Sequence, residues 1–157
     1  MISFIATEEL GKLAKWLRVL GHDCDYYGKE DESELVIKVL RDGRVLLTRG
    51  SRFSKYHGIR VIVITSDHVE DQVEQLVKEA GLELAEHRLF QRCVECNVEL
   101  VPVEKDAVKE KVPEYVFETN DDFKKCEKCG KIFWKGTHWD NVARKFKQLK
   151  KDQQKET

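Results

Sequence analysis

The sequence predicts an α/β protein in which a parallel sheet with flanking helices is followed by a small cysteine-rich unit and a C-terminal helix. Short apolar runs alternate with amphipathic stretches over residues 1–86, and this alternation implies crossover connections and helices on both faces of a parallel sheet. Beyond residue 86 the apolar residues become sparse and four cysteines appear in two doublets. We therefore divide the chain into residues 1–86, residues 87–150 and a polar tail, residues 151–157, that is expected to be disordered.

Apolar and β-branched runs mark the expected strands, because short continuous runs are typical of strands buried on both faces. The runs are Ile2–Ala6, Cys24–Tyr27, Arg44–Thr48 and Arg60–Thr65, and Leu82–Ala85 is expected as a further edge strand.

Three helices are expected between these runs. Leucines recur at helical spacing from Leu10 to Leu20, with Thr7 placed to cap the helix and Gly21 to end it. The second and third helices each begin with a capping-box pattern and end at a glycine. The second helix has Asp31 and Glu34 at its start and Gly43 at its end, and the third has Asp67 and Glu70 at its start and Gly81 at its end.

The segment after residue 86 contains short extended pieces and one final helix. The pieces Glu99–Val103 and Tyr115–Glu118 are expected to form hairpins. In the helix, Thr137 and Asp140 form a capping pattern. Its apolar stripe is formed by Val142, Phe146 and Leu149.

Each cysteine doublet has the form Cys-x-x-Cys, and the pairs are Cys93 with Cys96 and Cys126 with Cys129. Two intervening residues let both sulfurs of a tight turn face one point, and two such turns supply the four thiolates that zinc prefers in closed structural sites. Asn97 and Gly130 follow the doublets, and both tolerate the left-handed conformation that such turns need. We predict a structural zinc site, which contributes on the order of 10 kcal/mol to the folding of a small unit and leaves no open position for catalysis.

Two disulfides or a redox-active dithiol are the alternatives to a metal. Residues 1–21 mix charged side chains such as Glu8, Lys12 and Arg18 with apolar ones, which is unlike a signal peptide. The expected location is therefore the reducing cytosol, where disulfides are rare. A redox motif usually occurs as one doublet at a helix start, whereas this chain has two doublets in polar, turn-rich segments.

The composition favours a chain without a membrane span. Hydrophobic residues make up 41% and form no long run, and the length leaves room for one α/β core with a small appendage. The net charge is −1, but residues 124–157 contain eleven Lys or Arg against four Asp or Glu. This part of the chain is where an anionic partner is expected to bind.

Residues 4–21, with their leucine-rich and basic first helix, resemble the opening of PIN-like ribonuclease domains of the type named for the C-terminal part of the exonuclease Mut-seven. Further similarities lie at Gly43–Arg49, at Arg92–Asn97, and from Cys126 to Gly130 running into Phe133–His138. The resemblance covers nearly the whole chain. It implies a PIN-like fold followed by a zinc ribbon, in a family proposed to cut RNA with magnesium or manganese held by a cluster of acids.

The acids implied by this resemblance are incomplete. Carboxylates at the carboxyl ends of parallel strands would hold the hard cations, but Thr7 and Gly50 stand where the resemblance implies aspartates, and Ser51-Arg52 where it implies a further acid. The acid that opens the second helix remains as Asp31 or Glu32, which are the candidate catalytic residues. Metal affinity is expected to be poor with one or two carboxylates.

Three further acids lie near the expected strand ends and could substitute. They are Glu8, Glu9 and Asp67. Each also has a structural explanation, since Glu8 and Glu9 suit the helix dipole and Asp67 suits a helix cap. Asp31 has the same capping explanation.

Basic and aromatic residues form a candidate RNA-binding surface. One rim of the strand-end cleft is expected to carry Lys12, Lys15, Arg18 and Arg49. Residues 131–139 interleave basic with aromatic side chains, as single-strand binders do when bases stack between phosphate contacts. The candidates there are Lys131, Trp134, Lys135 and His138. Alternatively, the aromatic residues support the ribbon and the lysines are only solvated.

The remaining histidines and the fifth cysteine are interpreted without a functional role. The other four histidines are not spaced as metal ligands are, and we expect them on the surface. They are His22, His57, His68 and His87. Cys24 lies in an expected strand and is interpreted as a buried apolar residue.

Two function classes follow from these observations. In the binding class, the chain binds RNA with weak or lost nuclease activity, or serves as a protein-interaction module of an RNA-processing complex. In the enzyme class, it is a divalent-metal-dependent endoribonuclease in which Asp31 or Glu32 holds the cation and Arg49 contacts the phosphate. The missing acids favour the first class, and the resemblance favours the second.

Overall fold

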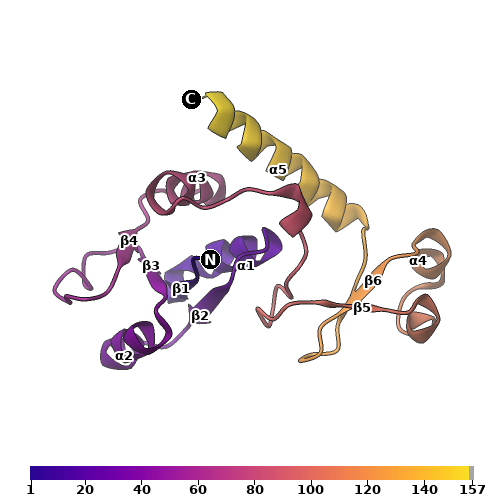
Figure 1. The fold of residues 1–157 in the computed structure, drawn as a ribbon, viewed down its shortest axis with the longest axis horizontal. Coiled ribbons are helices and arrows are strands. Elements are labelled where there is room, and N and C mark those ends of the chain that lie inside the picture. The colour runs from indigo at the N-terminus through magenta and orange to yellow at the C-terminus, as the bar shows by residue number, and fades with distance from the viewer. Residues whose placement is uncertain (156–157) are drawn as a thin grey trace.

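The larger sheet of the protein has four strands in the order β2-β1-β3-β4, and every neighbouring pair is parallel. A computed structural model describes residues 1–155 (Figure 1). The strands are β1 (Phe4–Thr7), β2 (Cys24–Tyr27), β3 (Val45–Thr48) and β4 (Val61–Val63). The predicted parallel sheet is confirmed.

Helices cover both faces of this sheet, as predicted. The helices are α1 (Gly11–Val19), which follows the 3-10 turn η1 (Glu8–Leu10), α2 (Glu32–Asp42) and α3 (Val69–Ala80). Side chains alternate between the faces of a strand. Ala6 and Leu47 therefore share a core with α1 and α3, whereas Ile5 and Leu46 pack against α2.

The second helix begins and ends as the sequence predicts. The Asp31 carboxylate accepts a hydrogen bond from the Glu34 backbone N–H at 3.0 Å. Gly43 ends α2 with a φ of 65°, and Gly81 ends α3 with a φ of 66°. Glycine adopts this left-handed conformation without the steric cost that a Cβ would bring.

The predicted caps at Thr7 and Asp67 are wrong, and Thr137 is the first residue of α5 itself. Strand β1 continues through Thr7, so its side chain is fully buried and donates to the Leu47 carbonyl at 3.4 Å instead of capping a helix. Asp67 binds Arg49. The helix α3 begins after His68 with no side-chain cap.

Two predicted strands are also wrong. Residues 82–85 form no ladder, although Leu82 and Leu84 are buried in the main core. The sheet ends at β4, whose Val63 is 41% exposed. Tyr115–Glu118 lies within the helix α4 (Glu114–Thr119).

The cysteine-bearing segment forms a small antiparallel sheet in the order β5-β6-β7. Its strands are β5 (Val101–Val103), β6 (Phe123–Lys125) and β7 (Ile132–Phe133). The 3-10 turn η3 (Lys105–Val108) and α4 lie between β5 and β6, and another 3-10 turn, η2 (Glu86–Arg88), precedes the segment. Val108, Val112, Val116 and Phe123 form its own small core.

The last helix, α5 (Thr137–Lys155), packs on the α/β core beside α3 (Figure 1). The predicted stripe is confirmed, since Val142, Phe146 and Leu149 are buried, and the last two belong to the main core. The helix continues past Lys151, so the predicted disordered tail is wrong for residues 151–155, and residues 156–157 lie outside the described residues. The division at residue 86 stays a prediction.

Candidate metal centre and nucleic-acid surface

The two cysteine doublets form turns with the same hydrogen-bond pattern. In the first, the Cys93 N–H donates to Val98 O at 2.9 Å and the Asn97 N–H donates to Cys93 O at 2.9 Å. In the second, the Cys126 N–H donates to Lys131 O at 3.0 Å and the Gly130 N–H donates to Cys126 O at 2.8 Å. Asn97 and Gly130 have φ values of 61° and 79°, which is the left-handed conformation that the sequence predicts.

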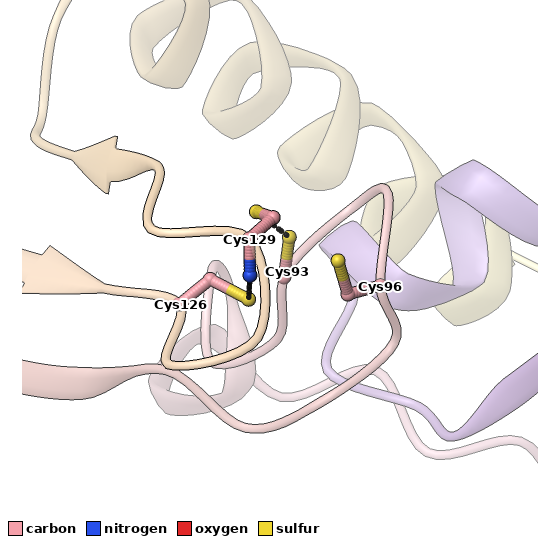
Figure 2. A group of neighbouring side chains, drawn as sticks. All are labelled: Cys93, Cys96, Cys126 and Cys129. Atoms are coloured by element: carbon pink, nitrogen blue, oxygen red, sulfur yellow. Dashed lines mark hydrogen bonds between the residues drawn. The ribbon is translucent and has the colours of Figure 1, made fainter.

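The four sulfurs face one another across the gap between these turns (Figure 2). All four ligand atoms lie within 4.8 Å of one another, and the Cys93 and Cys129 sulfurs are 3.9 Å apart. Sulfurs about 2.3 Å from a tetrahedral zinc ion are about 3.8 Å from each other. None of the four cysteines is in a disulfide. The cluster therefore has the ligand set and spacing for a metal ion.

The protonation of the cluster depends on its surroundings. Burial and the neighbouring thiols raise the pKa of Cys96 to about 12. Burial also raises the pKa of Cys126, but the backbone N–H groups of Cys129 and Lys128 outweigh it and bring that pKa to about 7. Four thiolates this close repel one another, so a bound cation is required to keep all four deprotonated.

The first turn is fastened to the α/β core by the side chain of Asn97. Its amide oxygen accepts the Cys24 N–H at 3.1 Å, and its amide nitrogen donates to Asp23 at 2.7 Å and to Asp25 at 3.1 Å. Arg44 and Arg92 pair with the same Asp23 carboxylate at 2.7 and 3.9 Å. Although burial raises the pKa of Asp23, the hydrogen bonds from Arg44 and Asn97 hold it below its ordinary value.

Arg18 belongs to the same contact, and its predicted place on the nucleic-acid surface is wrong. The residue is only 7% exposed. Its guanidinium donates to the carbonyls of Cys24 at 2.8 Å and Val94 at 2.7 Å. Because it lies in the last turn of α1, it reaches both the start of β2 and the first cysteine turn, and we assign it a structural role.

The acids at the carboxyl ends of the strands are paired with cations. Arg52 lies 3.6 Å from Glu8 and 4.0 Å from Glu9. The Glu9 carboxylate also accepts the Arg49 backbone N–H at 3.4 Å. Partial burial raises the pKa of Glu9, but its hydrogen bonds outweigh burial and leave that pKa below the ordinary value.

The candidate catalytic acids lie at the start of α2. Asp31 caps the helix, and Glu32 pairs with Lys55 at 3.2 Å. Hydrogen bonds from Tyr56 and Lys55 lower the pKa of Glu32. Within residues 1–155, the four cysteines are the only group of three or more His, Cys, Asp or Glu whose ligand atoms converge on one point.

Arg49 lies at the end of β3, as the sequence suggests, but its guanidinium already has two partners. It donates to the Ser66 carbonyl and pairs with the Asp67 carboxylate at 2.6 Å. A phosphate at this position would compete with Asp67. Thr7 is buried at the end of β1, and no atom lies within 4 Å of the place where a Cβ on Gly50 would stand.

The other candidate RNA-binding residues lie on two surfaces. Lys12 and Lys15 are exposed on α1, and Lys15 pairs with Glu95 at 3.4 Å. Lys131, Trp134, Lys135 and His138 lie around β7 and the start of α5. Trp134 and Lys135 line a hollow of about 790 Å³, which also includes Lys124. Burial lowers the pKa of Lys124, and the nearby charge of Lys135 lowers it further.

Two expectations for single residues have different outcomes. His22 is 1% exposed and not on the surface, because its Nε2–H donates to the Glu83 carbonyl at 2.7 Å. Cys24 is fully buried as predicted, and burial raises its pKa to about 12.

A parallel sheet flanked by helices and joined to a small four-cysteine sheet defines an α/β protein with a candidate metal centre. The profile of the Mut7-C RNAse domain matches residues 2–146, and the chain belongs to that family. No curated protein and no solved structure matches the chain. Among residues 1–155, every helix is too short or too polar to span a membrane.

Proposed function

We propose that this protein binds RNA, that a structural zinc ion holds its ribbon together, and that its nuclease activity is weak or lost. The family match makes RNA the expected partner. The pairing of the strand-end acids with basic side chains is the observation that carries the proposal. The reducing cytosol suits a site made of four thiolates, and we expect the protein to act there.

Zinc fits the cysteine cluster better than a harder cation. Thiolate is a soft ligand that suits zinc, whereas magnesium and manganese prefer oxygen. Zinc would be held by Cys93, Cys96, Cys126 and Cys129. With all four positions filled by sulfur, the ion keeps no place for water or substrate, so its contribution is to folding.

The strand-end acids are poorly placed to hold a second metal. A divalent cation there would compete with Arg52 for Glu8 and Glu9, and with Lys55 for Glu32. Each of these ion pairs engages one carboxylate oxygen, while Thr7 and Gly50 add no charge at the strand ends. The local arrangement weakens the case for metal-assisted cleavage at the strand ends.

The alternative is a divalent-metal-dependent endoribonuclease that uses Asp31 or Glu32. Membership of a family described as an RNAse domain favours it. In that case RNA would bring the metal with its phosphate and loosen the Glu32–Lys55 pair. A protein-interaction module of an RNA-processing complex is a further alternative.

The test is incubation of zinc-loaded protein with end-labelled single-stranded RNA, with manganese or with a chelator mild enough to spare the zinc. Retention and cleavage are scored on the same samples. The control is a double variant, Asp31→Asn and Glu32→Gln, because Asn preserves the helix cap while both changes remove charge. We expect retention without cleavage. Manganese-dependent cleavage that the double variant lacks would establish the nuclease instead, and the absence of both signals would refute RNA binding.

A further inference from the structure

A hollow of about 790 Å³ lies between the segment that leaves the α/β core and the small ribbon sheet. One wall of the hollow is formed by residues 86–91. The other wall comes from β5, β6 and the end of β7 with the residues after it. The start of α5 adds Trp139. This volume is in the range of pockets that bury nucleotide-sized ligands.

Several aromatic rings line the hollow. They are those of Phe90, Phe133, Trp134 and Trp139. Phe90 has a φ of 58°, and its ring lies 6.4 Å from Trp139 and 6.0 Å from His138, measured between ring centroids. Aromatic faces that line an open hollow provide surfaces on which flat ligands can stack.

Cations stand next to these rings. Lys124 and Lys135 line the hollow, as do the acids Glu86 and Asp122. The Lys135 ammonium lies 5.0 Å from the centroid of the Trp139 ring, and the Lys131 ammonium lies 5.4 Å from that of Phe133. Their charges therefore remain near the rings, where an anionic group on a stacked ligand would meet them.

We propose that this hollow is a binding groove for single-stranded RNA, in which bases stack on Trp134 and Trp139 while Lys124 and Lys135 contact the phosphates. The proposal rests on the RNA binding inferred above and assigns a place for it. Stacking requires unpaired bases, because a duplex hides the faces of its bases. An acidic protein segment would satisfy the lysines but leave the aromatic faces unused.

A second, smaller hollow gives the strand a path beyond the groove. It has a volume of about 360 Å³ and lies between α1 and α5, where Trp16, Arg144 and Lys145 line it. His138 also lines it and packs edge-to-face on Phe90 of the first groove. Affinity should therefore increase with oligonucleotide length until both hollows are occupied.

Tryptophan fluorescence can report on the groove directly, because two of the three tryptophans of the chain line it. A Trp16→Phe variant of the zinc-loaded protein leaves only Trp134 and Trp139 as reporters. We expect oligouridylate to quench their emission, because stacked bases quench indole. An abasic oligomer with the same backbone is the control and should quench little.

Three variants in the Trp16→Phe background locate the contact. Lys135→Glu and Trp139→Leu should each weaken oligouridylate binding about tenfold, as expected for the loss of a phosphate contact or of one stacked base. Lys147→Glu makes the same change of charge on the exposed side of α5 and should leave binding nearly unchanged. Because Lys135 is exposed, its variant remains informative if Trp139→Leu folds poorly.

The outcomes separate this groove from RNA binding itself. Retention of RNA without quenching, or equal weakening by Lys147→Glu, would overturn the groove while leaving RNA binding intact. Equal binding of polyglutamate and oligouridylate would show an acidic-protein site instead. No binding of any RNA would refute both the groove and the proposed function.

Discussion

Asn97 is predicted to hold the ribbon on the α/β core, and Asn97→Gly tests this with little disturbance of the turn. Glycine accepts the φ of 61° that Asn97 adopts, so the substitution removes the amide group and leaves the backbone conformation in place. The amide makes three hydrogen bonds, one to the Cys24 N–H and two to the carboxylates of Asp23 and Asp25.

The expected loss follows from these three bonds. A neutral hydrogen bond contributes about 1 kcal/mol and a bond to a charged group about 1.5 kcal/mol or more. Both carboxylates keep Arg44 as a partner and are not left unpaired. We therefore take the lower value, about 1.5 kcal/mol, for each bond to a carboxylate. We expect the free energy of unfolding to fall by about 4 kcal/mol, which for a chain of this size corresponds to a decrease in Tm of about 8–16 °C.

The assay is thermal unfolding of zinc-loaded protein, followed by circular dichroism. Gly130→Asn is the matched control, because Gly130 holds the same place in the second turn with a φ of 79° and no atom within 4 Å of an added Cβ. Asparagine tolerates that conformation, so the control should change Tm by little. A decrease below about 2 °C for Asn97→Gly, or an equal decrease in both variants, would refute the idea that Asn97 fastens the ribbon.

Three other predictions concern metal binding and pH. Cys96→Ser should abolish binding of one zinc per chain while Cys24→Ser retains it, as measured by elemental analysis of purified protein, and retention by both would refute the four-cysteine site. Burial lowers the pKa of His22, and its Nδ1 has no partner, so stability should be complete above the unfolded pKa of about 6.5 and fall as pH drops below it. A His22→Gln variant should show a smaller loss of Tm between pH 7.5 and 5.5 than the parent chain, and equal losses would argue against this role. Adding both Thr7→Asp and Gly50→Asp should strengthen manganese binding in calorimetry at fixed zinc loading, and no gain would show that these positions do not face a common site.

The sequence predicts the parts of the fold whose signals are local. Helical spacing of leucines, glycines at the ends of helices and the Cys-x-x-Cys doublets each depend on a few neighbouring residues. The left-handed Asn97 and Gly130 were predictable for the same reason. The helix α4 was not predicted, because it is short and buries only Val116 in the small core, so no apolar repeat within it separates a helix from an extended segment.

Contacts between distant segments were not predictable in this way. The side of α1 that carries Arg18 looks solvent-facing by its charge alone, yet the guanidinium reaches Val94, which lies 76 positions later in the chain. His22 is buried under the Glu83 carbonyl for a similar reason. In both cases a later segment covers a polar side chain and supplies its hydrogen-bond partners, and no pattern within one element shows this.

The position of the metal centre relative to the sheet limits what the metal can do. Asn97 and Arg18 fasten the first cysteine turn to residues 23–25, at the amino end of β2. Glu9 and Arg49 follow β1 and β3 and therefore lie at the carboxyl ends of the same parallel strands. The cysteine cluster and the strand-end acids thus lie at opposite edges of one sheet. A metal in the cluster would order the ribbon and the proposed RNA groove, but it could not serve as the ion of a reaction at the strand ends.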